Sequence, residues 1–222
     1  MREGQTFGSN VAKHKGAAVI TLVDYHAGNL ASVKKAFEFL GCDTVITEDP
    51  KVVCCAKHVV VPGVGHFAAT EQLTRAGLRD AVIEAIQQGA NILGICVGMQ
   101  WMFEGSTEAP EIKGLGLVKG MVERFPDGAK VPHVGWNTIE THGQSRILLG
   151  VASPSFVYYT HSYRAPVVTE TVGTTEYESS FSGVIEKDNC FGVQFHPEKS
   201  GMAGLKILEN FAKLPVNGHQ HP

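Results

Sequence analysis

Residues 91–100 read NILGICVGMQ, an apolar run that carries a cysteine between two glycines. The segment from Asn91 to Ile95 is typical of a buried strand, and a helix is predicted to open after Cys96. A tight strand-to-helix turn holds a nucleophile in a strained, exposed position, and the helix start offers backbone N–H groups to a developing oxyanion. The alternative is a packing role, because free cysteines are often small core residues.

The elements around this turn alternate between strand and helix. Strands are predicted at 17–23, 44–47 and 58–61, and helices at 30–40 and 79–88, with Asn29 as a candidate cap of the first helix. This alternation predicts an α/β fold with a mostly parallel central sheet covered on both faces. Short extended segments at 112–195 predict an antiparallel portion, and 201–214 a last helix.

Composition bounds the class of protein. The 222 residues carry a net charge of −3 and no long apolar run, which excludes a basic nucleic-acid face and a membrane span. Five cysteines without regular spacing argue against a disulfide scaffold and for a cytoplasmic protein. The neighbours Cys54 and Cys55 are predicted to point to opposite faces of a strand, and no motif for a metal or cofactor is visible, so we expect neither.

One domain is predicted, without repeats or a linker. It spans residues 17–214, between a flexible N-terminal extension at 1–16 and a frayed C-terminal tail at 215–222.

A second motif supplies the rest of an activated thiol. Residues 194–198 read QFHPE, and the proline excludes a helix interior, so His196 and Glu198 can face the same way. Glu198 can then hold one imidazole nitrogen and leave the other for Cys96. PGVG at 62–65 follows a buried strand and should reach the same sheet edge, where its amides could complete an oxyanion hole.

Further motifs stand around these two. They are DYHAGNL at 24–30, PHVGWN at 132–137, YTHSY at 159–163 and HPEKS at 196–200. With GICVGMQ and QFHPE they resemble the class I, triad-type glutamine amidotransferases over about residues 18–214. The finer signatures are similar to those of the glutaminase subunits of imidazole glycerol phosphate synthases, which serve histidine biosynthesis.

The resemblance implies a flavodoxin-like three-layer fold and a role for each matched residue. Cys96 would attack the side-chain amide of L-glutamine, His196 would act as base and then acid, and Glu198 would orient the imidazole. A glutamyl-thioester would form and hydrolyse. The resemblance implies an oxyanion hole at Gly63, Val64, Gly65 and Val97, and glutamine contacts at Gln100, Glu108, His161, Ser162 and Tyr163.

The resemblance also implies a heterodimer with a (β/α)₈ cyclase, which would receive the ammonia. Asn29, Trp136, Tyr158 and Lys199 match positions that face this partner. A core position is the alternative for Trp136. His26 departs from the family, which often has glycine there, and Val97 stands where leucine is commoner.

Other functions remain open on sequence alone. One is an amidotransferase subunit of another pathway, for anthranilate or pyridoxal phosphate synthesis, although Met99-Gln100, residues 132–137 and Lys199-Ser200 favour the histidine pathway. The others are a cysteine peptidase-like hydrolase with the same triad, and a non-catalytic scaffold.

Overall fold

The computed structural model describes residues 18–216, so the predicted extension at 1–16 and the tail beyond residue 216 lie outside the described residues. A nine-stranded sheet runs through this part of the chain. Its strands, in spatial order, are β2 (Asp43–Thr47), β1 (Val19–Val23), β3 (His58–Gly63), β4 (Asn91–Cys96), β12 (Cys190–Val193), β11 (Ser180–Lys187), β10 (Thr171–Glu176), β7 (His133–Thr141) and β8 (Ser155–His161).

The sheet changes character at β12. The pairs from β2 to β12 are parallel, and those from β12 to β8 are antiparallel. All residues of β3 and β4 are buried, because a parallel sheet is covered on both faces. A small second sheet joins β5 (Gly105–Ser106), β6 (Met121–Arg124) and β9 (Tyr163–Arg164). The predicted α/β fold with an antiparallel portion is confirmed.

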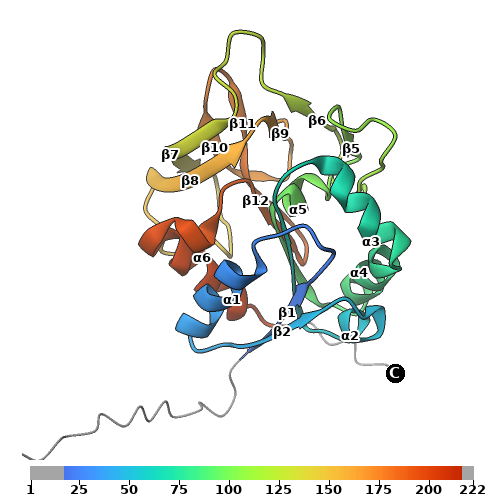
Figure 1. Ribbon diagram of the computed structural model, residues 1–222. Helices are drawn as coiled ribbons and strands as arrows, with labels where there is room; N and C mark the ends of the chain where they lie inside the picture. Colours follow the sequence, from blue (N-terminus) through green and yellow to red (C-terminus); the bar gives the residue numbers. More distant parts are fainter. Residues whose placement is uncertain (1–17, 217–222) are drawn as a thin grey trace, which may run out of the picture.

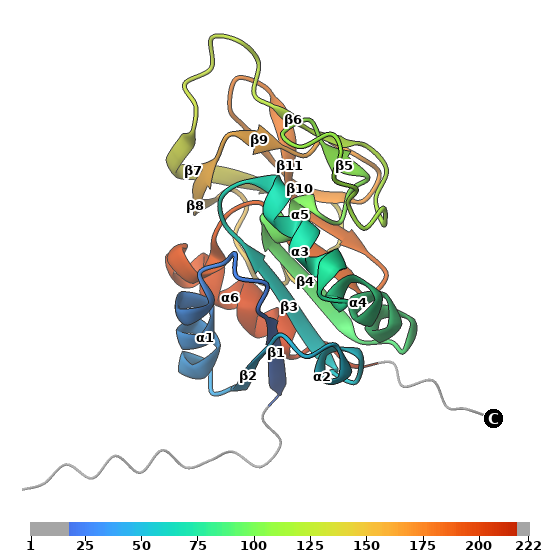
Figure 2. The same ribbon diagram turned by 45° about the vertical axis from the view of Figure 1, so that its right-hand side comes forward.

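Helices cover both faces of the parallel half, which therefore forms the middle of three layers (Figures 1 and 2). α1 (Leu30–Phe39) and α6 (Gly201–Ala212) lie on one side. α2 (Pro50–Cys54), α3 (Glu71–Arg75) and α4 (Leu78–Gln87) lie on the other. The short elements are α5 (Val97–Gln100), η1 (Phe67–Thr70) and η2 (Pro197–Lys199). None of the helices at residues 18–216 is long and apolar enough to cross a membrane.

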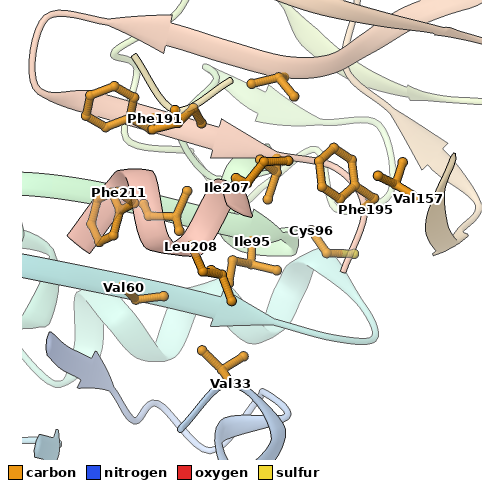
Figure 3. Close-up of a cluster of buried hydrophobic side chains, with 14 of the residues drawn as sticks. Val33, Val60, Ile95, Cys96, Val157, Phe191, Phe195, Ile207, Leu208 and Phe211 are labelled. Atoms are coloured by element: carbon orange, nitrogen blue, oxygen red, sulfur yellow. The ribbon is translucent and has the colours of Figure 1, made fainter. Parts of the chain in front are cut away.

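Two hydrophobic clusters fill the space between the sheet and these helices. In the first, Leu208 and Phe211 of α6 point toward Val60 of β3 and Ile95 of β4, and Cys96 lies at the margin of the same cluster (Figure 3). The candidate nucleophile Cys96 is therefore packed against the hydrophobic core, at the carboxyl end of β4.

Three local expectations need correction. Asn29 occupies the N-cap position of α1, but its side chain makes no capping hydrogen bond. Cys54 ends α2 and Cys55 follows it, so they do not lie on a strand, and their sulfur atoms are 3.7 Å apart. Pro215, the first residue of the predicted tail, is held to the sheet because its carbonyl accepts a hydrogen bond of 3.1 Å from Asn91.

Candidate active site

The turn at Cys96 is strained, as the sequence predicted. Cys96 has φ 54° and ψ −109°, a backbone conformation that residues other than glycine rarely adopt. A Cβ atom at Gly98 would lie 1.8 Å from the carbonyl oxygen of Val61, and one at Gly94 would lie 2.5 Å from that of Gly98. The two glycines therefore allow α5 to lie directly on β3 and β4, which fixes the position of the cysteine.

A short helix follows the cysteine, where the sequence predicted that a helix opens. α5 has four residues, so its macrodipole is small, and what it offers at the site is the free backbone N–H groups of its first turn. The N–H of Val97, the residue after the cysteine, is one of them.

His196 reaches Cys96 because β12 and β4 are parallel neighbours. Val193 pairs with Ile95, so the chain that continues from each strand emerges at the same sheet edge. Nδ1 of His196 lies 3.0 Å from Oε1 of Glu198, and both side chains are buried. Nε2 of His196 makes no hydrogen bond of standard geometry, yet the imidazole lies close enough to the Cys96 sulfur for the sulfur to raise its pKa.

The backbone of this segment is held as firmly as its side chains. The amide of His196 donates to the carbonyl of Tyr158 at 2.9 Å, and its own carbonyl accepts from the Ser200 hydroxyl at 2.7 Å. That hydroxyl also accepts a 2.9 Å hydrogen bond from the amide of Tyr158. η2 is thereby fixed to β8.

The surroundings of His196 favour its protonated form. Burial alone lowers the pKa of an imidazole, but the Cys96 sulfur and the Glu198 carboxylate outweigh burial and raise the pKa of His196 to about 9. At neutral pH the arrangement can therefore hold an imidazolium beside the nucleophilic sulfur. Such a pair can attack a carbonyl carbon and protonate the leaving group.

A cavity of about 350 Å³ opens over the cysteine. Its size suits a small molecule. The predicted residues that line it are Gly65, Cys96, Val97, Gln100, Glu108, His161, Ser162 and Tyr163. Gly63 and Val64 are not among its lining residues, whereas His66, Pro132 and Thr160 line it without having been predicted.

A carboxylate stands in the cavity wall at Glu108. Its Oε2 accepts a 2.7 Å hydrogen bond from the amide of Phe67, and its Oε1 lies 3.9 Å from Nε2 of His66. The carboxylate is mostly buried, so it offers a fixed negative charge to a ligand that carries an ammonium group.

Gly63 lies beside the nucleophile, although it does not line the cavity. It is the last residue of β3 and pairs in register with Cys96. A Cβ atom at this position would lie 2.5 Å from the hydroxyl of Tyr25 and 2.7 Å from Cβ of Val97, so glycine is required. The predicted oxyanion segment thus begins at the sheet edge of Cys96, and Gly65 continues it into the cavity wall with φ 91°.

One buried side chain at the site was not singled out from the sequence. Nε2 of Gln194 lies 3.7 Å from the sulfur of Cys96, and its Oε1 lies 3.1 Å from Nε2 of Gln100. Gln194 belongs to the QFHPE motif, so the signal was its place two residues before His196.

The elements that carry or adjoin the predicted partner residues, α1, α6, β7 and β8, lie on one side of the molecule, at the left of Figure 1. Trp136 is 56% exposed, which rejects a core position, and it packs against Tyr158, its cross-strand partner. Nζ of Lys199 lies 5.9 Å from the centre of the Tyr158 ring. Asn29 precedes α1, which contacts η2.

His26, the departure from the family pattern, has a backbone explanation. Its φ of 62° lies in the left-handed region that favours glycine. The histidine is held there by a 2.9 Å hydrogen bond from its amide to Asp24, and its exposed ring lies 3.3 Å from Glu48.

Within residues 18–216 no group of three or more histidine, cysteine or acidic side chains is placed to hold a metal ion. The candidate site is therefore described by its triad, its cavity and the glycine segment beside it.

Comparison with known proteins shows the family of this chain. The family model for class I glutamine amidotransferases matches residues 21–214. The imidazole glycerol phosphate synthase subunit HisH of Thermococcus kodakarensis is 45% identical over 202 residues, which cover 88% of this chain and all of that protein. The chain belongs to the HisH family of class I glutamine amidotransferases. HisH of Salinibacter ruber is 43% identical over 206 residues, covering 88% of this chain and 94% of the relative.

Solved structures agree on the fold of this HisH family member. A crystal structure of a glutamine amidotransferase superposes with a TM-score of 0.69 at 18% identity, covering 87% of this chain and 99% of the other. A chain of PurLQS from Thermotoga maritima superposes with a TM-score of 0.65 at 18% identity, covering 88% of this chain and 97% of the other. At this identity the likeness concerns the fold alone.

Proposed function

We propose that this chain is the glutaminase subunit of an imidazole glycerol phosphate synthase, releasing ammonia from L-glutamine for histidine biosynthesis. The observation that carries the proposal is the buried His196–Glu198 pair, 3.0 Å apart, beside a strained cysteine that lines a small cavity. The family supports glutamine as the substrate and the histidine pathway over anthranilate or pyridoxal phosphate synthesis.

The first half-reaction uses the thiolate and the imidazolium. The Cys96 sulfur attacks the side-chain carbonyl carbon of glutamine, and the electron pair of the C=O bond moves to oxygen. Amides at Val97 and along Gly63 to Gly65 stabilise that oxyanion. The intermediate collapses with cleavage of the C–N bond while His196 gives its proton to the departing nitrogen, so ammonia and a glutamyl-thioester result.

The second half-reaction returns the enzyme to its starting state. Neutral His196 takes a proton from water, whose oxygen attacks the thioester carbon, and cleavage of the C–S bond releases glutamate and the thiolate. Glu198 holds Nδ1 throughout, which keeps Nε2 directed to the reacting atoms.

Glutamine is held by its α-amino and α-carboxylate groups. The Glu108 carboxylate pairs with the α-ammonium group, and Gln100 together with the backbone of His161, Ser162 and Tyr163 fixes the rest of the molecule. Support for these contacts comes from the cavity, which all five residues line.

The ammonia passes to a (β/α)₈ cyclase partner that docks on the exposed face of β7 and β8. Val134, Trp136, Phe156 and Tyr158 share that face, because Trp136 pairs with Tyr158 and strand side chains alternate. The first three are more than half exposed, and an exposed aromatic cluster is typical of an interface. Lys199 adjoins this docking face through its contact with the Tyr158 ring, and Asn29 precedes α1, which contacts η2.

Glutaminase turnover is low in the isolated chain and rises when the liganded cyclase binds. Docking changes the segment from Gly63 to Gly65, whose glycine peptides can reorient to complete the oxyanion hole. Equal turnover with and without the liganded cyclase would refute this coupling.

The decisive experiment measures glutamate release from glutamine by the chain alone and with a cyclase and its nucleotide substrate. Cys96→Ala is expected to abolish glutamine-dependent synthesis, whereas synthesis from added ammonium salt persists in the same complex. Cys55→Ala, an exposed cysteine outside the cavity, serves as the control and should leave both activities intact. Retained glutaminase activity in Cys96→Ala, or hydrolysis of peptides but not of glutamine, would refute the proposal.

A further inference from the structure

The sulfur of Cys96 has a neighbour to which the mechanism above gives no role. Gln194 follows β12, is fully buried, and has its backbone amide bound to the carbonyl of Gly183 at 2.9 Å. Its side-chain Nε2 lies 3.7 Å from the Cys96 sulfur. Among residues 18–216 it is the one side-chain N–H group in hydrogen-bonding geometry with that sulfur.

The orientation of an amide is meaningful only if its surroundings distinguish nitrogen from oxygen. Here they do, starting at the carbonyl oxygen of Tyr163, which only accepts hydrogen bonds. It lies 2.8 Å from Nδ1 of His161 and 2.9 Å from Nε2 of Gln100. Nδ1 of His161 therefore carries the proton, and the Gln100 atom that faces this carbonyl is the amide nitrogen.

The same reasoning assigns the donors and acceptors from Gln100 to Cys96. The Gln100 nitrogen has two hydrogens, and the second points to the side chain of Gln194 at 3.1 Å. The atom that receives it must be Oε1 of Gln194. The other end of that amide, the NH₂ group, then faces the sulfur.

The hydrogen bonds between His161 and His133 are consistent with this assignment of donors and acceptors. Since His161 donates through Nδ1, its Nε2 accepts from Nδ1 of His133 at 3.1 Å, and Nε2 of His133 accepts from the amide of Asn137 at 3.4 Å. Burial lowers the pKa of His161 to about 3 and that of His133 to about 4. Both rings are therefore neutral at pH 7, and each has one donor and one acceptor.

Of the ionisable groups that face the sulfur, only His196 is charged. His196, the residue before η2, is the cation of the site. Tyr25, which follows β1, is kept neutral because burial and the charge of Cys96 raise its pKa. His161 from β8 is neutral as well. The sulfur thus has one charged partner, and the remaining donor directed at it is the amide of Gln194.

We propose that Gln194 is a further catalytic residue, whose side-chain N–H group donates to the Cys96 sulfur and stabilises it as the thiolate. The hydrogen-bond chain from Tyr163 through Gln100 keeps the donor end of the amide on the sulfur. The inference rests on the proposed function in that Cys96 is taken as the nucleophile. A hydrogen bond to the charged thiolate is stronger than one to the neutral thiol. Loss of the hydrogen bond from Gln194 therefore disfavours the thiolate.

The test is the rate at which iodoacetamide alkylates Cys96 in the full chain between pH 5 and 9, followed on the Cys96 peptide by mass spectrometry. Gln194→Met keeps the length of the side chain and removes the donor. We expect the midpoint of its alkylation profile to move up by about one pH unit, with about tenfold slower alkylation at pH values below both midpoints. Gln194→Glu, nearly identical in shape, replaces the donor by a carboxylate and should move the midpoint in the same direction.

Asn210→Ala is the matched control for loss of a buried amide. Asn210 holds the carbonyls of Ile147 and Leu149 at 3.0 and 2.7 Å and makes no contact with Cys96, so this variant should melt earlier with an unchanged alkylation profile. A native profile in Gln194→Met would show that Gln194 only joins β12 to α5 and would overturn the proposal. If Gln194→Met does not fold, an unchanged profile in Gln194→Glu overturns it.

Alkylation does not require glutamine, so the two proposals fail separately. A shifted profile in a chain that releases no glutamate even with the liganded cyclase would refute the proposed function and leave the role of Gln194 standing. Glutaminase activity in the native complex, together with an unchanged alkylation profile in the Gln194 variants, would support the proposed function and overturn the role of Gln194.

Discussion

Replacing Gly98 by alanine tests the geometry that places the nucleophile. A Cβ atom at this position would lie 1.8 Å from the carbonyl oxygen of Val61, and ordinary contact begins at 3.4 Å. Either α5 or β3 must therefore move by about 1.6 Å. Both belong to the closely packed middle of the molecule, where the neighbouring side chains leave little space for such a shift.

Two effects follow from that displacement. Overpacking of this kind costs about 1–3 kcal/mol, and in a domain of this size each kcal/mol lowers Tm by about 2–4 °C. Gly98→Ala should therefore melt about 2–12 °C below the native chain. A displacement of about 1 Å at a reacting group costs about 100-fold in rate, so glutaminase activity in the presence of the cyclase should fall by about two orders of magnitude.

The measurements are thermal unfolding followed by circular dichroism and glutamate release in the complex. Gly105→Ala is the control, because the atom nearest to its new Cβ would be the flexible end of Met121 at 3.2 Å. This control should keep its Tm and its activity. If Gly98→Ala also keeps both, α5 does not lie on β3 as closely as described, and the reasoning is wrong.

Three further outcomes are expected. In Glu198→Gln the pKa of His196 falls from about 9, so the alkaline limb of the glutaminase pH profile, where the imidazolium that protonates the departing nitrogen is lost, should move to lower pH; an unmoved limb would contradict the pairing. His26→Gly relieves a left-handed backbone, keeps the amide that bonds Asp24, and should raise the free energy of unfolding by about 0.5 kcal/mol in urea titrations, whereas a decrease would show that the ring contact with Glu48 outweighs the strain. Trp136→Ala should weaken cyclase binding, measured by calorimetry, by about 2 kcal/mol with an unchanged Tm; equal affinity would remove Trp136 from the interface.

Much of the parallel half could be predicted, because each of its elements carries a local signal. β3 and β4 are short β-branched or apolar runs that end at glycine or cysteine, and α4 ends before Gly89. The turn at Cys96 could be predicted for the same reason, since glycines at 94 and 98 mark where backbone approaches backbone.

The rest depends on contacts between distant segments. Cys54 and Cys55 were expected on a strand because two valines precede them, but Pro50 starts a helix that the Asp49 side chain caps. Nothing local reveals that the amide of Gln194 would meet the sulfur of a cysteine 98 residues earlier. His66 was missed because a single histidine after a glycine turn carries no pattern, and only the folded cavity places it near Glu108.

The parallel pairing of β12 with β4 has a consequence for how the enzyme loses activity on heating. The nucleophile and its base leave adjacent central strands, so they belong to one cooperative unit, and no partial opening can separate them while the sheet persists. The amides of these strands should exchange with deuterium only through global opening, while those around Gly65 exchange sooner. Irreversible inactivation should then follow the global unfolding rate, and a stabilising change anywhere in the central sheet should extend the working life of the triad.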